Sequence, residues 1–347
     1  MTLAGVIANK NCKQPATKTT REKALMPNKV CVALLAGGSS SERDISLKGG
    51  EKVYEALDKN KYRVLRYDPR CDIPRLFADA ADIDVALVIL HGSHGEDGTI
   101  QGLLDLLNIP YQCSGPLGSA VAMNKVASKT LYEAAGIPVP AYMHVKANAA
   151  VDLEGAVHRL GLPMVVKPAS SGSSIGMSIV RDAGALPKAL ETAFFYDESV
   201  LFEHYISGVE ITGAVIGNDT PEALPIVEIV PESHHEYFNF TAKYTAGETR
   251  EICPARIGEA FTRQAQALAC KAHETLFCQG YSRTDMILSQ DRIFVLETNT
   301  IPGMTPASLL PLAASTQGMT FGQLLDRLIH LALARARTGF EKGDKQI

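Results

Sequence analysis

Two runs near the carboxyl end of the chain decide the fold. They are Tyr281-Ser282-Arg283-Thr284-Asp285-Met286-Ile287-Leu288 and Arg292–Glu297, and the second continues as Glu297-Thr298-Asn299-Thr300-Ile301-Pro302-Gly303. Each run has strand length and apolar character, so we predict two adjacent strands. Because side chains alternate along a strand, Arg283, Asp285 and Glu297 should point to one face, together with Asn299.

These four side chains form a candidate metal site. Asp285, Glu297 and Asn299 offer oxygen ligands, which suit a magnesium ion that bridges nucleotide phosphates. Arg283 adds a fixed cation for developing negative charge. The pattern alone fits a surface network of ion pairs on a hairpin equally well. Both interpretations stay open at this point.

Further elements surround this pair of strands. The sequence predicts strands near 208–217 and 223–230 and a helix from Glu259 to Phe277. The loop 231–252 is long for a compact domain, and it carries the run Tyr237-Phe238-Asn239-Phe240-Thr241-Ala242-Lys243-Tyr244. Since long loops in compact domains are usually functional or disordered, the aromatic and lysine content favours function.

A smaller α+β unit lies upstream. Pro163 to Lys167 and Ile175 to Val180 predict an antiparallel hairpin with the tip Pro168-Ala169-Ser170-Ser171-Gly172-Ser173-Ser174. Helix 185–196 and strand 199–204 complete the unit. Backbone N–H groups of the tip could cradle phosphate beside Lys167, although such tips are usually only flexible. Neither the Walker A pattern nor the GxGxxG fingerprint occurs in the chain.

The first part of the chain predicts a parallel α/β domain. Strands are expected at 30–35, 62–67 and 85–90 and helices from about Ser46 to Leu57 and over 125–132. Alternation of strands and helices places binding loops at the carboxyl ends of the strands. The glycine loop 37–41 and the run His91-Gly92-Ser93-His94-Gly95-Glu96-Asp97-Gly98 occupy such ends. No third ligand is spaced to complete a zinc site with the two histidines.

Composition excludes several classes of protein. The 347 residues carry a net charge of −4, which argues against nucleic acid or an anionic membrane as the main partner. No run approaches the roughly 18 apolar residues of a membrane span. The seven cysteines are odd in number and lack CxxC spacing, so reduced thiols in a cytoplasm fit best. The basic segment 1–29 is expected to be a disordered extension or an early start before Met26, with a transit peptide less favoured.

Nine motifs follow one another along the chain in a known order. They are Gly37-Gly38-Ser39-Ser40-Ser41-Glu42-Arg43-Asp44-Ile45-Ser46-Leu47, His91–Gly98, Met123-Asn124-Lys125, Lys167-Pro168 with Gly172-Ser173-Ser174-Ile175-Gly176, Glu203 through Ser207-Gly208-Val209-Glu210, Ala242-Lys243-Tyr244, Cys253-Pro254-Ala255, Arg283-Thr284-Asp285, and Glu297 through Thr305. With them, the chain resembles the D-alanine–D-alanine ligases of the ATP-grasp superfamily. The match extends from residue 30 to about residue 330.

The resemblance implies an ATP-grasp fold that combines α/β and α+β parts. It divides the chain into a 30–122 N-terminal parallel-sheet (pre-ATP-grasp) domain, a 123–212 central domain and a 213–338 C-terminal catalytic domain, with an extension at 1–29 and a tail at 339–347. The nucleotide would lie between the two antiparallel sheets of the central and C-terminal domains. A homodimer through the N-terminal domain is expected.

The resemblance also assigns the nucleotide and metal contacts. Lys125 and Lys167 would touch ATP phosphates, and Lys243 would reach the γ-phosphate from a lid, loop 231–252. The adenine and ribose would meet the residues Glu203, His204, Tyr205, Ile206 and Glu210. Two magnesium ions, with manganese as a possible substitute, would be held by Asp285, Glu297 and Asn299.

The implied reaction joins two D-alanine molecules for peptidoglycan precursor synthesis. The first D-alanine carboxylate would take the γ-phosphate and become an acyl phosphate, which the amine of the second then attacks. Glu42 would bind the first ammonium group, in a hydrogen-bonded set with Ser173 and Tyr244, although a lone acid there could simply cap the following helix. His91 would lie near the first substrate. The second would meet Ser308 and Leu309, while Arg283 and the N–H of Gly303 would face the oxyanion.

Some positions depart from the usual pattern of this family. They are Asn124, Thr284, Thr298 and Phe238-Asn239-Phe240, and none of them is an expected ligand. The alternatives are a D-alanine–D-serine or D-alanine–D-lactate ligase and a nucleotide-binding protein without ligase activity. Lys243-Tyr244 and Leu309 argue against the lactate enzyme, while serine is harder to exclude. A nicotinamide dehydrogenase fails on the missing fingerprint.

Overall fold

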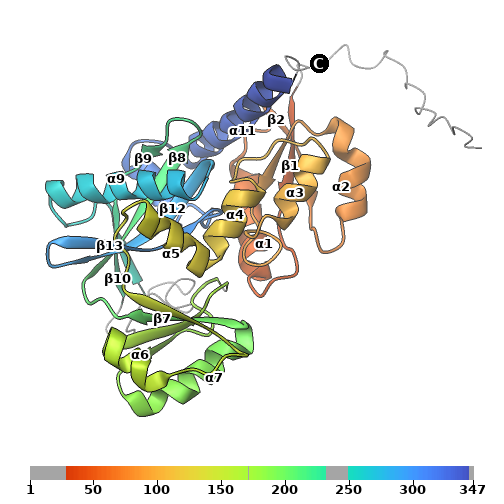
Figure 1. The fold of residues 1–347 in the computed structure, drawn as a ribbon. Coiled ribbons are helices and arrows are strands. Elements are labelled where there is room, and N and C mark those ends of the chain that lie inside the picture. The colour runs from red at the N-terminus through yellow and green to blue at the C-terminus, as the bar shows by residue number, and fades with distance from the viewer. Residues whose placement is uncertain (1–28, 171, 232–248, 344–347) are drawn as a thin grey trace, which may run out of the picture.

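Three β-sheets organise the part of the chain that the computed structural model describes, residues 29–170, 172–231 and 249–343 (Figure 1). One sheet is parallel and two are antiparallel, as the sequence predicts. None of the described helices is long and apolar enough to cross a bilayer.

The N-terminal sheet has three parallel strands in the order β2-β1-β3. They are β1 (Val30–Leu35), β2 (Tyr62–Tyr67) and β3 (Val85–Val88), with helices α1 (Arg43–Ala56), α2 (Ile73–Asp79), the short η1 (Ala80–Asp82), α3 (Thr99–Leu106) and α4 (Pro116–Met123). The predicted bounds of the first two strands are confirmed. The third strand is two residues shorter than predicted, and α1 begins at Arg43 rather than Ser46.

The central sheet is antiparallel with the strand order β4-β7-β5-β6. Its elements are α5 (Lys125–Ala134), β4 (Tyr142–Lys146), α6 (Leu153–Leu160), β5 (Met164–Pro168), β6 (Ser178–Val180), η2 (Ala183–Ala185), α7 (Leu186–Tyr196) and β7 (Ser199–His204). The predicted hairpin is confirmed. Its second strand starts at Ser178 and not at Ile175, because Ser173, Ser174 and Gly176 have positive φ angles of 52°, 58° and 74°, which no strand can contain.

The C-terminal sheet has the order β11-β10-β8-β12-β13, with β9 paired to β8. Its elements are β8 (Val209–Gly217), β9 (Glu222–Ala223), β10 (Val227–Pro231), β11 (Thr249–Ile252), α9 (Glu259–Thr275), β12 (Gly280–Ser289), β13 (Arg292–Asn299), α10 (Leu309–Thr316) and α11 (Phe321–Gly343).

Three predictions about this sheet were wrong in detail. The strand expected over 223–230 is divided in two around Pro225, which has no N–H for a sheet hydrogen bond. The end of the predicted loop 231–252 forms β11, and residues 232–248 lie outside the described part of the chain. The helix predicted to reach Phe277 ends at Thr275, since Phe277 has a φ angle of 56°.

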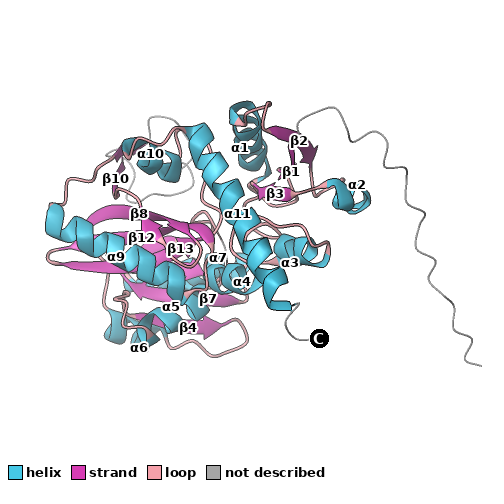
Figure 2. Cartoon of the chain, turned by 90° about the horizontal axis from the view of Figure 1, so that it is seen from above, coloured by secondary structure: helices cyan, strands magenta, loops and turns pink. Residues whose placement is uncertain are grey.

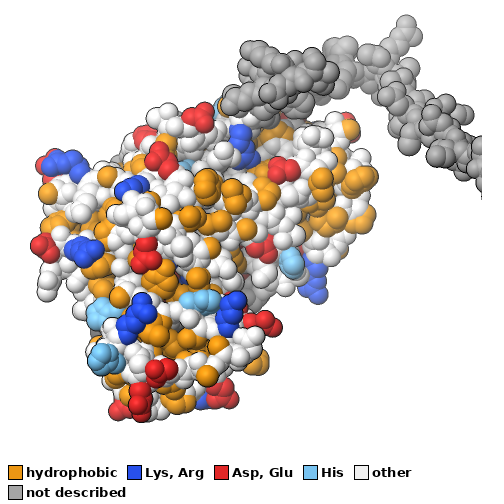
Figure 3. Space-filling model, in the orientation of Figure 1, with side chains coloured by type: hydrophobic (Ala, Val, Ile, Leu, Met, Phe, Trp, Pro, Cys, Tyr) orange, Lys and Arg blue, Asp and Glu red, His pale blue; other side chains and the backbone are white. Residues whose placement is uncertain are grey.

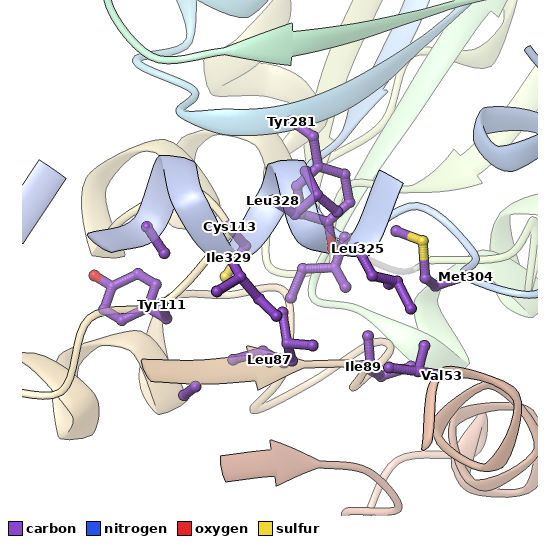
Figure 4. Close-up of a cluster of buried hydrophobic side chains, with 14 of the residues drawn as sticks. Val53, Leu87, Ile89, Tyr111, Cys113, Tyr281, Met304, Leu325, Leu328 and Ile329 are labelled. Atoms are coloured by element: carbon purple, nitrogen blue, oxygen red, sulfur yellow. The ribbon is translucent and has the colours of Figure 1, made fainter. Parts of the chain in front are cut away.

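Helix α11 joins the C-terminal part of the chain to the N-terminal sheet. Figure 2 shows it between the strands of the C-terminal sheet and α3. Its side chains Leu325, Leu328 and Ile329 pack against Leu87 and Ile89 (Figure 4). The segment predicted as 213–338 therefore shares a hydrophobic core with the segment predicted as 30–122, and α11 continues into the predicted tail.

Gly280 lies where the C-terminal sheet meets the N-terminal domain, and we expect Gly280→Ala to destabilise the fold by about 2 to 4 kcal/mol. The residue has a φ angle of 72°, and an added Cβ would lie 1.8 Å from the carbonyl oxygen of Gln112. Positive φ costs a residue with a side chain about 1 to 2 kcal/mol, and the backbone overlap adds to that cost.

Gly136→Ala is the matched control for this prediction. Gly136 has a similar φ angle of 69°, but nothing lies within 4 Å of its added Cβ. Urea unfolding should therefore show the cost of φ alone, about 1 kcal/mol, for Gly136→Ala. Equal losses of stability in the two variants would contradict the proposed overlap with Gln112.

Candidate active site

Two cavities meet at a wall formed by Lys125 and Glu297. The first, of about 560 Å³, lies among the loops after β1 and β3, the hairpin tip, β12 and β13, and the loop 300–309. The second, of about 120 Å³, lies between the central and C-terminal sheets. Figure 1 shows these two sheets as separate layers, with β7 in one and β13 in the other.

The second cavity collects the residues predicted to bind the nucleotide. It is lined by Lys125, Lys167, Glu203, His204, Tyr205, Ile206 and Glu210. Apolar side chains from both sheets, Val165, Ile179, Ile287 and Leu296 among them, form the rest of the lining. Such a slot with a few charged groups suits a planar base and its sugar. Lys243 lies outside the described residues.

A β-bulge shapes the wall that the two cavities share. Asp285 pairs with Glu297, but Met286 pairs with Val295, so Leu296 has no partner on β12. Simple alternation would send Leu296 and Glu297 to opposite faces. With the bulge, both side chains line the second cavity.

Glu203 is the centre of a buried charge group that the sequence analysis found only in part. Its Oε1 lies 2.7 Å from Nζ of Lys129, and its Oε2 lies 2.7 Å from Nζ of Lys167. Burial acts to raise the pKa of Glu203, but the two positive charges outweigh it and hold the pKa below its usual value. Lys129 was missed, although its position four residues after Lys125 places both on one face of α5.

The predicted metal ligands come together on β12 and β13. Asp285 lies opposite Glu297, and Arg283 lies opposite Asn299. Nε and Nη2 of Arg283 donate to the two oxygens of Asp285 at 2.8 and 2.7 Å. The Oγ1 of Thr212 donates to Oδ1 of Asp285 at 2.7 Å, and Nδ2 of Asn299 approaches Oδ2 at 3.3 Å.

Asp285, Glu297 and Asn299 can bind a divalent cation if the side-chain amide of Asn299 is turned over. In the arrangement described, both oxygens of Asp285 accept hydrogen bonds and Asn299 presents its N–H₂ group. Turning the amide of Asn299 would offer its oxygen instead and release one donor from Oδ2 of Asp285. Two carboxylates and one amide oxygen would then face the shared wall, where Nζ of Lys125 lies 3.7 Å from Oε2 of Glu297.

Glu42 reaches into the first cavity from the start of α1. The side chain is 4% exposed and makes no hydrogen bond that caps the helix, so the capping alternative is wrong. Instead, the Oγ of Ser173 donates a short hydrogen bond to Oε1 of Glu42. The contact links the N-terminal domain to the hairpin tip of the central domain. Tyr244, the third expected member of this set, lies outside the described residues.

Two more titratable groups line the first cavity, the buried His91 and the partly buried Glu96. Burial lowers the pKa of His91, and nearby Arg283 acts in the same direction. Burial and the charge of Glu42 raise the pKa of Glu96 to about 8, which favours the protonated carboxyl group in the folded chain. Glu96 was not singled out from the sequence, although it belongs to the run that follows β3.

The remaining predicted residues also line the first cavity. They are Gly303, Ser308 and Leu309, at the entry to α10. The Oγ of Ser308 accepts from the backbone N–H of Thr305 at 3.1 Å, and a Cβ on Gly303 would lie 3.0 Å from that same Oγ. Gly303 therefore allows its backbone to approach Ser308 closely.

Asn124, Thr284 and Thr298, which depart from the usual family pattern, make hydrogen bonds that stabilise the fold. Asn124 caps α5 by accepting from the backbone N–H groups of Val126 and Ala127. The hydroxyl of Tyr132 donates to Oγ1 of Thr298 at 2.7 Å, and Thr284 lies 2.8 Å from the same oxygen. These buried hydrogen bonds give both threonine hydroxyls a partner, and none of the three residues is a proposed ligand.

Two antiparallel sheets that enclose a mostly apolar slot, beside paired carboxylates, define an ATP-grasp enzyme. The family descriptions "D-ala D-ala ligase C-terminus" and "D-ala D-ala ligase N-terminus" match residues 131–330 and 74–114. The chain belongs to the D-alanine–D-alanine ligase family.

Similar proteins cover nearly the whole described fold. The chain is 59% identical to a D-alanine–D-alanine ligase of Syntrophobacter fumaroxidans over 88% of its own length and 98% of the relative. A crystal structure of the Bacillus anthracis ligase complexed with ATP has a TM-score of 0.78 at 34% identity, covering 89% of this chain and 99% of that one. The VanG D-Ala:D-Ser ligase of Enterococcus faecalis has a TM-score of 0.77 at 30% identity, covering 88% and 100%.

Proposed function

We propose that the chain joins two D-alanine molecules, with ATP in the second cavity and the amino acids in the first. The observation that carries this proposal is the wall of Lys125 and Glu297, because it places a nucleotide slot directly beside a cavity that holds Glu42, Arg283 and Gly303. The enzyme is an ATP-dependent ligase of the cell-wall precursor pathway, and its family requires a divalent metal. A carboxylate must first become an acyl phosphate, so that an amine can attack its carbon and phosphate can leave.

The proposed nucleotide contacts come from residues of the second cavity, between the central and C-terminal sheets. Glu203 to Ile206 would line the adenine, Glu210 would accept from the ribose hydroxyls, and Lys125 and Lys167 would meet the phosphates, as would Lys243. Asp285, Glu297 and Asn299 would hold two magnesium ions, or manganese in their place. The metal, when bound, neutralises phosphate charge during transfer.

The proposed contacts to the two amino acids come from residues that line the first cavity. Glu42 would bind the ammonium group of the first D-alanine, supported by Ser173 and Tyr244, with His91 close by. Arg283 and the backbone N–H of Gly303 would face the oxyanion that forms when the second amine attacks. Ser308 would receive the carboxylate of the second D-alanine and Leu309 its methyl group.

The test of this function is phosphate release in the presence of ATP, magnesium and D-alanine, with L-alanine as the control. We expect release with D-alanine and formation of D-alanyl-D-alanine in equal amount. ATP binding without amino-acid-dependent phosphate release would instead support a nucleotide-binding protein without ligase activity.

A D-alanine–D-serine ligase is the second candidate, because the VanG enzyme is a structural relative. The apolar side chain of Leu309, only 7% exposed, favours a methyl group over a hydroxymethyl group in the second position. Competition among D-alanine, D-serine and D-lactate at neutral pH separates the candidates. Dominant D-alanyl-D-serine would overturn the assignment of Leu309.

We also propose a homodimer formed through the N-terminal domain and acting in the cytoplasm. Large apolar side chains are exposed on that domain at Phe77 in α2, Leu106 in α3 and Leu117 in α4. Figure 3 shows hydrophobic side chains over these helices, among charges of both signs. Sedimentation of the wild-type chain and of Leu106→Glu tests the proposal, with a monomeric wild type as the contrary result.

Ser173→Ala should raise KM for the first D-alanine about 10-fold to 100-fold, with a smaller change in kcat. The variant removes the hydroxyl that donates to buried Glu42, and a hydrogen bond to a charged group contributes about 1.5 to 3 kcal/mol. Steady-state kinetics with D-alanine varied measures the change. Ser170→Ala is the control because Ser170 is exposed on the same hairpin tip. Similar KM values in the two variants would contradict the role of Ser173.

A further inference from the structure

The buried side chain of Lys129 has no part in the reaction proposed above. It is 0% exposed and, within the described part of the chain, lines neither of the two cavities. Taking an ammonium group out of water costs several kcal/mol unless a partner compensates it. A hydrophobic residue would fill this space at less cost, so the charge itself needs a reason.

The geometry gives each oxygen of Glu203 a different lysine. Oε1 lies 2.7 Å from Lys129, which is enclosed, whereas Oε2 lies 2.7 Å from Lys167, which lines the second cavity. Neither Nζ of Lys129 nor Oε1 has an aligned hydrogen-bond partner among the described residues, so their contact is an ion pair. Oε2 is therefore the oxygen of Glu203 that could give up its lysine and bind another group in the second cavity.

Exchange of that partner follows from the proposed function, on which this inference rests. If Lys167 turns to the phosphates of the nucleotide, Oε2 becomes available to the base. Lys129 cannot follow, because it is enclosed, and it keeps a positive charge beside Oε1. Glu203 then remains an ionised carboxylate, which accepts hydrogen bonds and donates none.

We propose that Lys129 is a positioning residue for nucleobase specificity: by keeping Glu203 ionised, it makes the enzyme select a 6-aminopurine nucleotide over a 6-oxopurine nucleotide. The 6-amino group of adenine donates to a carboxylate. The 6-oxo group of hypoxanthine or guanine presents lone pairs to the same oxygen and is repelled. A buried polar site of this kind discriminates strongly against a base that cannot pair with it.

Loss of the charge at Lys129 should change the protonation of Glu203. The charged or titratable groups around Glu203 are Lys129 on α5, Lys167 on β5 and Tyr142 on β4. With Lys167 engaged by phosphate and Lys129 replaced, burial would favour the neutral carboxyl group. A neutral carboxyl group can donate to a 6-oxo group, so the discrimination should weaken.

The experiment compares kcat/KM for ATP and for inosine triphosphate in the full chain, wild type and Lys129→Met. We expect the ATP to inosine triphosphate ratio to fall at least about 10-fold in the variant at pH 7 and to recover as pH rises and Glu203 ionises. The wild-type ratio should stay constant over that range. Lys129→Arg, which keeps the charge, should retain the wild-type preference.

Val180→Ala controls for loss of stability in the same domain, since Val180 is buried in the core of the central sheet. An equal loss of kcat/KM for both nucleotides in Lys129→Met, as in this control, would overturn the proposal. Glu203→Gln offers a second route if Lys129→Met does not fold, because its amide can donate to a 6-oxo group. A shift toward inosine triphosphate in Glu203→Gln supports the placement of Glu203 against the base, on which the role of Lys129 depends, and Lys129→Arg then tests that role.

The two variants distinguish the role of Lys129 from the placement of Glu203 against the base. If Glu203→Gln shifts the ratio and Lys129→Met does not, Glu203 faces the base as proposed and the role of Lys129 is overturned. If neither substitution shifts the ratio while D-alanine-dependent ligation persists, the placement of Glu203 against the base is overturned as well.

Discussion

Arg283→Met is expected to lower kcat for dipeptide formation about 1000-fold. The guanidinium group donates through Nε and Nη2 to the two oxygens of Asp285, at 2.8 and 2.7 Å, and the Arg283 side chain is only 12% exposed. It is therefore fixed before the substrates arrive and loses little freedom during the reaction. Removal of one preorganised oxyanion donor costs about 100-fold to 1000-fold in other enzymes, and loss of the charge places this variant at the upper end.

The variant should separate the two chemical steps. Arg283 is proposed to face the oxyanion of the second step, so formation of the acyl phosphate should be less affected than attack by the second amine. An acyl phosphate that waits longer is hydrolysed more often. Parallel assays of phosphate and dipeptide should then give more phosphate per dipeptide than the wild type.

Arg256→Met is the matched control for this substitution. Arg256, in the segment after β11, pairs at 2.5 Å with Glu228 on β10 of the same sheet, but its side chain is 58% exposed and, among the described residues, it lines neither cavity. This variant should keep kcat within about 2-fold, because in the described structure Arg256 touches neither cavity and its loss acts only on the Glu228 carboxylate. An unchanged ratio of phosphate to dipeptide in Arg283→Met would contradict the assignment to the second step.

The pairing of β12 with β13 could be predicted from the sequence because both strands carry strong local signals. Arg283 and Asp285 stand two residues apart, as do Glu297 and Asn299, so alternation along paired strands brings these four to one face. The observed pairs Arg283 with Asn299 and Asp285 with Glu297 confirm that prediction. The bulge at Leu296 could not be predicted, because an unpaired residue in a strand leaves no distinct mark in the alternation.

The environments of Lys129 and Glu96 could not be predicted from the sequence, for a different reason. Lys129 and Glu96 look like ordinary exposed residues of a helix and a loop. The burial of Lys129 and the partial burial of Glu96 depend on elements far away in the chain. Lys129 is enclosed only because β7 and β5 bring Glu203 and Lys167 to the same place. Glu96 gains its raised pKa from burial and from Glu42, which belongs to another loop. Only the assembled fold shows which charges lose contact with water.

Glu297→Gln is expected to lower kcat about 1000-fold and to raise the magnesium concentration needed for half-maximal activity. Glu297 lies in the wall that both cavities share, opposite Asp285 and near Lys125. A neutral amide in this position offers one weaker oxygen ligand and leaves the positive charge of Lys125 less compensated. Loss of charge stabilisation worth several kcal/mol corresponds to a change of about three powers of ten in rate.

The measurement is a magnesium titration of activity at saturating ATP and D-alanine, repeated with manganese. Glu222→Gln is the control, since Glu222 pairs with Arg327 at 2.5 Å on the same sheet and lies outside the lining of both cavities in the described part of the chain. Chelation of the metal should stop the wild-type reaction, and thermal unfolding should show that the Glu297→Gln fold is retained. A magnesium requirement equal to that of the wild type would exclude Glu297 as a ligand. A rate loss without that change would instead support a role for Glu297 in holding Lys125, because the substitution also weakens their 3.7 Å ion pair.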